Sequence, residues 1–485
     1  MVGAGYRHLH GEAGRRRDGA SRRGLSVGQW LFWAGLAAAL VWGLLLRPSH
    51  TALLVVAVVQ SGFVLMGCWR LLLTVVSRRR PSSAPEPEAW PRYTVLAALH
   101  DEAAVTLQLI RRLAALDYPP DRLQAMLLLE ADDAPTIAAA LNAERPDWLE
   151  VVIVPDGTPR TKPRALNYGL ARATGELVTI YDAEDEPHPM QLKEAGSHFM
   201  ADQAGRLGCL QAPLRIRPAT GKRFHERFLS RQFAVEYAAL FEVTLPAMAR
   251  LGLPFPLGGT SNHFRASALR AVGGWDAWNV TEDADLGLAL WRAGWRQGVI
   301  ASPTLEAAPT RLYDWLPQRT RWLKGYMQTW GVHTRNPFGL GLGGILAMIL
   351  SIGGTIAAAA SHAAALTGVA ATVLVALVAG LPPQASLTAL GVLAFGVVSA
   401  WISCWLGARR AGVPYDLRDI LLAPLCWALL SLAFAHAVQR LIREPFAWDK
   451  TAHLPDESEL HAPVSPPSAS SSPDDNGLRI RPVSL

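Results

Sequence analysis

The stretch LVTIYDAED, Leu177 to Asp185, combines two kinds of sequence that rarely follow each other without a purpose. Its first five residues are apolar, β-branched or aromatic, which is typical of a buried strand. The next four include three carboxylates, Asp182, Glu184 and Asp185. The start of a following helix needs only one such residue as a cap. The stretch therefore predicts a buried strand whose carboxyl end carries a polar site.

Three earlier segments repeat this pattern. The apolar runs YTVLAALH, QAMLLLE and LEVVIVP are each followed by an amphipathic segment, and we expect these helices to begin at Asp101, Ala134 and Lys162. Strands that alternate with helices predict an α/β domain with a mostly parallel sheet and flanking helices. Ligands of such sheets bind at the carboxyl ends of the strands. We therefore look for chemistry at that edge.

Acidic residues occur at these strand ends repeatedly. The first strand ends at Asp101 and Glu102, and the second is followed by Asp132 and Asp133. A single acid such as Asp101 can simply be the N-cap of the next helix. Several carboxylates at one edge suit Mg²⁺ or Mn²⁺, whose coordination is completed by water and substrate phosphates. The implied ligand is a metal-bound pyrophosphate.

The rest of the 485-residue chain is dominated by long apolar runs, at Gln29–Leu46, Leu53–Val76 and about 340–438. Runs of this length match the thickness of a bilayer. We expect two helices at the N-terminal end and four more, at about 340–361, 363–381, 386–407 and 418–441, giving about six spans. A parse with one span between 340 and 381 is the alternative. A cleaved signal peptide is not expected, because a second apolar run follows the first at once.

Charge sets the expected orientation. The clusters Arg15-Arg16-Arg17, Arg22-Arg23 and Arg78-Arg79-Arg80 flank the first two helices, which places both ends of this hairpin in the cytoplasm. The positive-inside rule is broken in either parse. With six spans Arg409-Arg410 lies outside, and with one span between 340 and 381 Arg440, Arg443 and Lys450 lie outside instead.

The basic clusters near the first two helices account for much of the net charge of +6. Nucleic acid is not expected as a partner, since no basic stripe is interleaved with aromatic residues. The four cysteines and thirteen histidines show no metal-ligand spacing.

The expected organisation has five parts. They are a cytoplasmic basic tail (1–26), a transmembrane hairpin (27–77), a cytoplasmic globular domain (78–335), further transmembrane helices (336–441) and a membrane-proximal segment with a Ser/Pro-rich tail (442–485).

Three short motifs in the globular domain carry a resemblance. DAED at Asp182–Asp185, TED at Thr281–Asp283 and QRTRW at Gln318–Trp322 occur in the order seen in family 2 glycosyltransferases. The chain most resembles their membrane-embedded processive branch, which includes cellulose, chitin and hyaluronan synthases. The resemblance covers about residues 90 to 335 and implies a GT-A-like domain.

The resemblance implies roles for individual residues. Glu102 and either Asp132 or Asp133 would hold the nucleoside, and Lys162 would contact the diphosphate. Asp182 and Glu184 match a DxD metal motif in which the second Asp is replaced, so the choice between Glu184 and Asp185 as a metal ligand stays open. Asp283 resembles the base that deprotonates the acceptor hydroxyl.

Further residues are expected near the acceptor and the leaving group. Gly259 and Thr260, in PLGGTSNHFR, and Glu282, which also gains from a helix dipole, would lie beside the acceptor. In a helix, Gln318, Arg321 and Trp322 share a face. Arg321, with Arg319, could neutralise the leaving diphosphate, and Trp322 could stack on a sugar. Anchoring at the membrane interface is expected for Lys324, Tyr326 and Trp330 rather than for Gln318, Arg321 and Trp322. It is also expected for the segment REPFAWDKTAH, Arg443 to His453.

The expected activity is that of an inverting, metal-dependent membrane glycosyltransferase of the bacterial inner membrane. It would transfer a hexose from a nucleotide-sugar donor, expected to be UDP-linked, to a β-linked exopolysaccharide that leaves through its own helices. Membrane lipid is an expected partner, and export partners are left open. One alternative is a transferase that adds a single sugar to a lipid, such as a polyprenyl phosphate or diacylglycerol. Another is an inactive scaffold or transporter, although intramembrane charges are nearly absent. QRTRW and the number of helices favour the polymerase.

Overall fold

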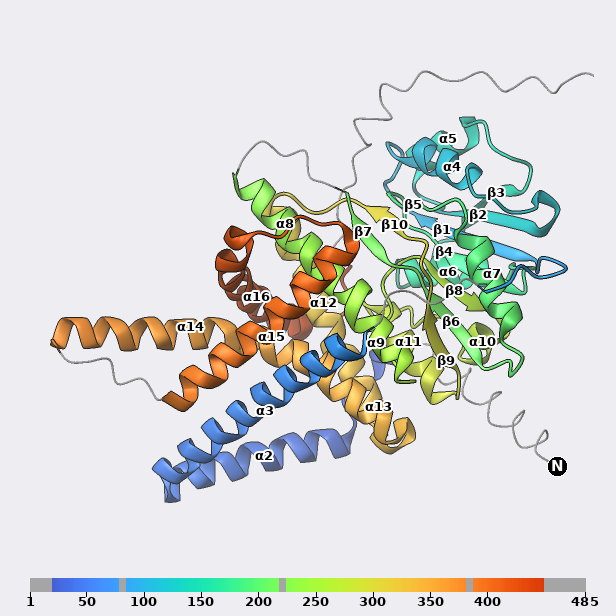
Figure 1. Cartoon of the computed structure of the whole chain (residues 1–485). Helices are drawn as coiled ribbons and strands as arrows, with labels where there is room; N and C mark the ends of the chain where they lie inside the picture. The colour runs from blue at the N-terminus through green and yellow to red at the C-terminus, as the bar shows by residue number, and fades with distance from the viewer. Residues whose placement is uncertain (1–19, 78–83, 218–223, 381–386, 449–485) are drawn as a thin grey trace, which may run out of the picture.

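A computed structural model of the chain describes residues 20–77, 84–217, 224–380 and 387–448. An α/β domain lies on one side of the molecule, and long apolar helices project from its other side (Figure 1). The basic clusters at 15–17 and 78–80, Lys450 and the C-terminal tail fall outside the described residues.

The central sheet is mixed but mostly parallel. Among the described residues it has seven strands, in the order β3 (Leu149–Val154), β2 (Leu123–Glu130), β1 (Tyr93–Leu99), β4 (Leu177–Ile180), β8 (Asn262–Arg265), β6 (Leu207–Gln211) and β9 (Arg296–Val299). The first four are parallel, β8 is antiparallel to both of its neighbours, and β6 and β9 are parallel. A small second sheet contains β5 (Glu186–Pro187), β10 (Thr304–Glu306) and β7 (Leu214–Ile216). The expectation of an α/β fold with a mostly parallel sheet is confirmed.

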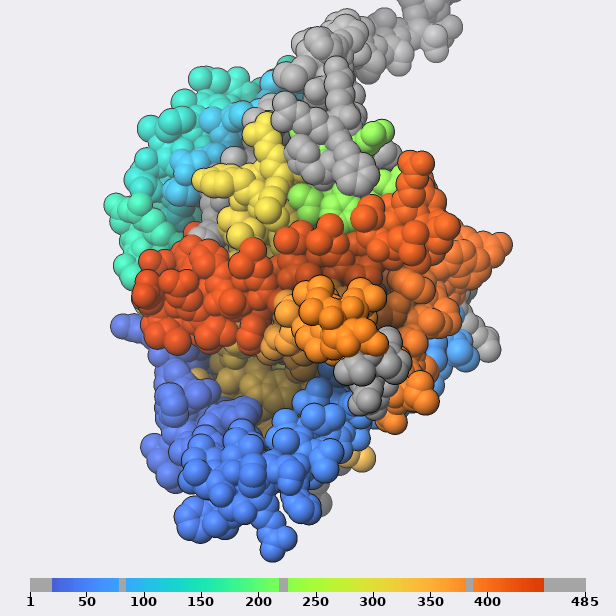
Figure 2. Space-filling model, turned by 90° about the vertical axis from the view of Figure 1, so that its left-hand side faces the viewer, coloured from blue at the N-terminus to red at the C-terminus, as the bar shows by residue number. Residues whose placement is uncertain are grey.

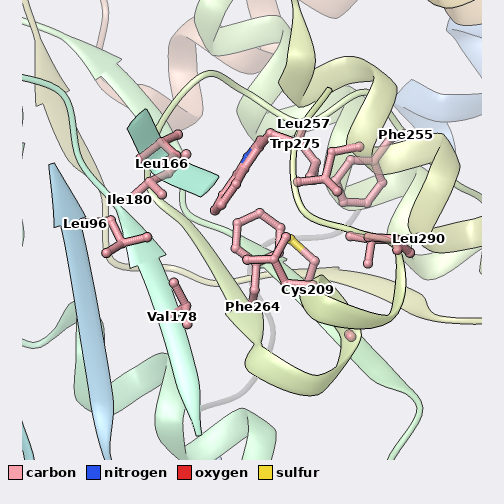
Figure 3. Packing of buried hydrophobic residues seen from close by; sticks show 14 of the residues in the cluster. Leu96, Leu166, Val178, Ile180, Cys209, Phe255, Leu257, Phe264, Trp275 and Leu290 are labelled. Carbon is pink, nitrogen blue, oxygen red and sulfur yellow. The ribbon is translucent and has the colours of Figure 1, made fainter. Parts of the chain in front are cut away.

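Successive side chains of the strands point to opposite faces of the sheet, where they form two apolar layers. Val95 and Leu127 pack with α4 (Thr106–Ala114), α5 (Ala134–Asn142) and α7 (Gln191–Ala201). Leu96 and Leu128 point to the other face, which is covered by α6 (Lys162–Leu170), α10 (Ala266–Ala271) and α11 (Glu282–Arg292). On that second face, Phe264 meets Trp275 edge to face at 5.8 Å, beside Val178 and Ile180 (Figure 3). Burial on both faces explains why the strands are apolar throughout.

Two of the three predicted helix starts are confirmed, and one is wrong. α5 and α6 begin at Ala134 and Lys162, but the first helix, α4, begins at Thr106 and not at Asp101. Asp101 has φ 53°, in the left-handed region, which is not a helix-cap conformation, although Asp tolerates it better than most residues do. The backbone therefore makes a turn over residues 101–105 before the helix starts.

Three helical segments connect the sheets to the apolar part. α8 (Phe224–Ala239) continues through a π-helical turn, η3 (Leu240–Thr244), into α9 (Leu245–Arg250), and α12 (Leu312–His333) follows the last strand. Short 3₁₀ turns lie at η1 (Ser21–Arg23), η2 (Pro120–Arg122) and η4 (Pro337–Leu340).

Five helical segments in the described part of the chain are long and apolar enough to cross a membrane. They are α2 (Val27–Leu46), α3 (Pro48–Val76), the continuous segment 337–379 that includes α13 (Gly341–Met348), η5 (Ile349–Gly353) and α14 (Gly354–Ala379), α15 (Leu387–Ala411) and α16 (Leu417–Arg443). The expected break between 361 and 363 is wrong. Ser361 instead donates to the carbonyl of Ala357 within the helix, at 2.6 Å. Among the described residues the count is therefore five, where the sequence predicts about six, and it agrees with the alternative parse.

The last of these helices differs from the others in its position. At its start, Asp419 pairs with Arg231 of α8, and Nε of Arg231 lies 2.9 Å from Oδ1. Just after its end, the carbonyl of Ala447 accepts from Lys324 of α12 at 2.8 Å. Viewed from the side of the projecting helices, α16 runs across their base (Figure 2). Both ends of α16 are thus held by the helices beneath the α/β domain.

Candidate active site

A cavity of about 340 Å³ lies at the carboxyl edge of the parallel strands, between the sheet and α12. Its lining includes residues that are far apart in sequence: Glu102, Lys162, Asp182, Glu184, Gly259, Thr260, Glu282, Asp283, Gln318, Arg321 and Trp322. These positions come from the ends of β1 and β4, from the loop before β8, from the starts of α6 and α11, and from α12. The predicted meeting of these groups in one cleft is therefore present in the structure.

The cavity is acidic. Eight carboxylates line it, against the three cationic side chains of Arg160, Lys162 and Arg321. Lys162, at the start of α6, donates to Asp182 and, at 2.8 Å, to the carbonyl of Gly259. Although burial opposes the charged ammonium, Asp182 and Glu282 together raise the pKa of Lys162. Three cations do not balance eight carboxylates, so the cavity keeps an excess of negative charge.

The carboxylates after β4 have different positions. Asp182 and Glu184 line the cavity, whereas Asp185 is completely buried behind them. Asp185 accepts from the amide of Asp182 at 2.7 Å and from the hydroxyl of Thr260. Burial, followed by the nearby Asp182 and Glu184, raises the pKa of Asp185 well above its usual value. Asp185 is therefore suited to shape the loop, and Asp182 and Glu184 face the cavity.

The donor set fits a hard divalent cation. Glu306, on β10, adds a further carboxylate, and burial and then Asp185 raise its pKa well above normal. In the described part of the chain, no three His, Cys, Asp or Glu side chains are arranged to hold an ion by themselves. Mg²⁺ and Mn²⁺ do not require this, because they usually take one or two protein carboxylates and complete their shell with substrate oxygens. Asp182 and Glu184 provide such a pair.

The three acidic residues of the sequence TEDAD (Thr281–Asp285) have separate environments at the start of α11. Asp285 pairs with His333 of α12, with 2.9 Å between Oδ1 and Nε2. Asp283 accepts from the amide of Ala284 at 2.7 Å and lines the cavity. Glu282 is 3% exposed, and burial, with Asp283 next to it, raises its pKa to about 8. Burial also raises the pKa of Asp283. Thr281 occupies the N-cap position, but its side chain does not cap the helix.

α12 presents the predicted face to the cavity. Gln318, Arg321 and Trp322 all line it, as helical spacing requires. Arg321 also donates to the carbonyl of Val280 at 3.2 Å, which ties α12 to the loop before Asp283.

The chain can now be placed among known proteins. The model of the "Glycosyl transferase family group 2" matches residues 177–439, more than half of the chain. The chain belongs to this family.

Curated relatives of this glycosyltransferase include enzymes of two kinds. The "Probable glycosyltransferase YdaM" of Bacillus subtilis is 25% identical over 62% of this chain and 66% of its own length. A "Beta-monoglucosyldiacylglycerol synthase" of Synechocystis sp. is 28% identical over 52% of both chains. The "Cellulose synthase 1 catalytic subunit [UDP-forming]" of Komagataeibacter xylinus is 27% identical over 52% of this chain and 33% of its own. The chain thus spans only about a third to two thirds of the length of these relatives.

Four of the residues predicted to serve the glycosyltransferase site do not line the cavity: Asp132, Asp133, Asp185 and Arg319. Asp132 pairs with Arg160 at the rim. Asp133 is the N-cap of α5 and accepts from the amide of Thr136 at 3.2 Å. Direct contact of these carboxylates with a nucleoside stays a prediction.

Arg319 points away from the cavity. Its guanidinium pairs with Glu236 of α8 at 2.6 Å and lies over the rings of Phe233 and Trp322, at 4.8 and 4.9 Å. Helical geometry explains this, because neighbouring residues such as Arg319 and Gln318 differ by about 100° in direction. In this structure Arg319 supports Trp322 and does not reach the place expected for a diphosphate.

Two interpretations of interfacial residues are wrong. Lys324 is fully buried and donates to the carbonyls of Glu444 and Ala447, so it does not anchor at a membrane surface. The described part of REPFAWDKTAH packs on the α/β domain, with Phe446 edge-on to Trp278 at 5.0 Å. Its Trp448 lines the cavity and lies 4.7 Å from the guanidinium of Arg321.

Trp448, Glu130, Glu306 and Tyr237 are cavity residues without a predicted role. Glu130 could have been found, because it ends the second strand. Trp448 lies in REPFAWDKTAH, a segment whose basic and aromatic composition favours the membrane surface. Glu306 and Tyr237 had no signal in their local sequence.

Proposed function

We propose that the protein transfers a hexose, with inversion, from a UDP-linked donor to the hydroxyl or phosphate oxygen of a membrane lipid. The observation that carries this proposal is the single cavity shared by Asp182, Asp283 and Arg321. It combines a carboxylate edge for a metal-bound diphosphate, a half-buried base and a cation for the leaving group.

The proposed reaction is one displacement. Asp283 takes the proton of the acceptor hydroxyl, whose oxygen bonds to the anomeric carbon as the bond from that carbon to the diphosphate breaks. Arg321 and Lys162 stabilise the charge on the departing nucleoside diphosphate. A divalent cation bound by Asp182 and Glu184 would add positive charge at the diphosphate. Trp322 and Trp448 offer flat surfaces that orient the sugar and exclude water.

The arrangement of the apolar helices favours a lipid over a growing polysaccharide as acceptor. None of the most apolar window of α2 is buried, and only 6% of that of α3 and of the segment 337–379. A channel for a hydrated polymer would require helices packed around a lumen. The similarity to a glucosyldiacylglycerol synthase over half of the chain supports the same acceptor class.

Transfer to an exported polysaccharide remains the second candidate. It is favoured by the similarity to a cellulose synthase catalytic subunit and by the stacked aromatic rings of Trp322 and Tyr237 beside the cavity. Polymer export by this chain would need other subunits to complete a channel.

One experiment separates these candidates. Purified protein in lipid is incubated with radiolabelled UDP-glucose or UDP-N-acetylglucosamine and Mg²⁺ or Mn²⁺, with diacylglycerol or polyprenyl phosphate as acceptor. A single organic-soluble product is expected. High-mass, glycosidase-sensitive material would identify a polymerase, and no product from any donor would contradict sugar transfer.

A further inference from the structure

One cation lies inside an otherwise apolar helix. Arg70 is six residues before the end of α3 at Val76, or about 9 Å along the helix. Its Nη1 contacts two neutral oxygens of α15, the carbonyl of Gly396 at 3.5 Å and Oγ of Ser399 at 3.4 Å. Among the described residues, these partners of Arg70 are neutral and neither is a carboxylate. A charged residue in a membrane helix that lacks a counter-charge indicates a functional site.

The depth of Arg70 follows from its neighbours. His362 of α14 stacks on Trp427 of α16, with ring centroids 5.5 Å apart. Arg70 is close enough to His362 to interact with it electrostatically. Because both ends of α16 are held by α8 and α12, α16 and its neighbours lie at the base of the projecting helices (Figure 2). If α16 lies in the membrane interface, Arg70 is level with the lipid headgroups nearest the α/β domain.

The groups around Arg70 are suited to a phosphate. An Arg guanidinium can donate two parallel hydrogen bonds to phosphate oxygens. Nδ1 of His362 is buried and has no hydrogen-bond partner in the described structure. The surrounding faces of α3 and α15 are apolar and suit acyl or isoprenoid chains. Close packing of Gly67 on Phe395, where an added Cβ would meet the ring at 2.5 Å, fixes α3 against α15 one turn away.

We propose that Arg70, with His362, binds the phosphate of a membrane lipid in the leaflet next to the α/β domain. This site lies outside the sugar-transfer cavity and does not depend on the proposed reaction. Its ligand class is an anionic lipid whose headgroup phosphate lies between α3, α14 and α16.

Native mass spectrometry of the full chain in neutral detergent tests this site. The protein is titrated with phosphatidylglycerol and, as a lipid without phosphate, with diacylglycerol. Wild type is expected to bind phosphatidylglycerol more tightly than diacylglycerol. Arg70→Gln is expected to lose at least about fivefold in affinity for phosphatidylglycerol, because one basic residue near an anionic surface contributes about 1 kcal/mol. Arg47→Gln, at the opposite and exposed end of α3, is the matched control and should bind as wild type does.

Two more variants and a competition separate lipid binding at Arg70 from misfolding and from binding of free phosphate. Arg70→Lys keeps the charge and should retain most of the affinity for phosphatidylglycerol. If Arg70→Gln does not fold, His362→Ala replaces it as the test variant and should also bind phosphatidylglycerol more weakly than wild type. Equal affinity of Arg70→Gln and wild type, or equal binding of diacylglycerol, would overturn the proposal. Displacement of the lipid by inorganic phosphate at similar concentration would assign the site to free phosphate and also overturn it. Since sugar transfer is not measured, these outcomes are independent of the proposed function.

Discussion

The carboxylates of the TEDAD sequence differ in function because they differ in surroundings. Asp285 is hydrogen-bonded to His333, whereas the buried Glu282 and the half-buried Asp283 lie near Lys162 and Arg321. Burial disfavours the charged form of a carboxyl group and raises its pKa. A carboxylate whose pKa is raised toward neutral pH is a better general base. The local environment of Asp283 thus matches the role that its sequence position implies.

Substitution of Asp283 tests this role. Asp283→Asn keeps the shape of the side chain and removes its ability to accept a proton. We expect transfer to fall at least about 100-fold, the lower range for a general base, while UDP binding measured by calorimetry stays within about twofold. Loss of binding in parallel with activity would show that the residue supports the site and does not act on the acceptor.

The pH dependence of transfer follows from the raised pKa of Asp283. The base acts only when it is deprotonated, so activity is lost as the pH falls through this pKa. We expect the acid limb of kcat/KM to lie above the ordinary Asp pKa of about 3.9. The same dependence of kcat/KM, measured between about pH 4 and pH 9 on the Glu282→Gln variant, should retain that acid limb. The reason is that burial is the main cause of the raised pKa of Asp283. If the limb disappears in this variant, Glu282 is the titrating group.

At the scale of elements, α11 and α12 form one unit around the site. Val280 donates to Gln328 at 3.1 Å, Asn279 donates to Thr329 at 3.0 Å, and Arg321 donates to the carbonyl of Val280. The two helices can approach this closely only because position 325 is Gly. A Cβ there would lie 2.3 Å from Oγ1 of Thr281. The TED loop and the QRTRW helix are therefore positioned together.

Gly325→Ala should separate these elements. The added methyl group meets Thr281, a short β-branched side chain with little room to move, so α12 must shift away from Asp283. A misplacement of about 1 Å can cost on the order of 100-fold in rate, and we expect a loss of this size in kcat.

A second substitution in the same helix provides the control for Gly325→Ala. At Gly331 an added Cβ would only touch Leu25 at 3.4 Å, so Gly331→Ala should keep wild-type activity. Circular dichroism should show the same helix content for both variants. Equal activity of the two variants would contradict close packing of α11 and α12.

At the scale of the whole molecule, the position of α16 determines the topology. Its apolar composition alone permits a span, but its two ends contact α8 and α12 on the same side of the molecule. If α16 lies in the membrane interface, the chain crosses the membrane four times. Arg409, Arg410, Arg440 and Arg443 then share one side with Arg22 and Arg23, as the positive-inside rule requires.

Cysteine accessibility distinguishes these topologies. In a background in which the four native cysteines are replaced, Gly412→Cys, Arg443→Cys and Gly380→Cys are labelled with a membrane-impermeant maleimide. We expect Gly412→Cys and Arg443→Cys to react only in inverted vesicles and Gly380→Cys only in intact cells. Labelling of Arg443→Cys from outside the cell would show that α16 spans the membrane.

Three features can be predicted from the amino-acid sequence alone: the alternation of strands and helices, the acidic edge of the sheet, and the shared face of Gln318, Arg321 and Trp322. These features follow from local periodicity, from the strand-end rule for parallel sheets and from short motifs. Local patterns also identified the apolar helices, because hydropathy depends on composition alone.

The other features depend on contacts between segments that are distant in sequence. Arg319 and Lys324 look like ligands or anchors in sequence, but the helix turns them toward Glu236 and toward the carbonyls after α16. Trp448 and Glu306 reach the cavity from segments distant in sequence. A hydropathy profile cannot separate a spanning helix from one lying at the surface, because the difference rests on what its two ends contact. Such contacts are set by packing between remote segments, and no local pattern encodes them.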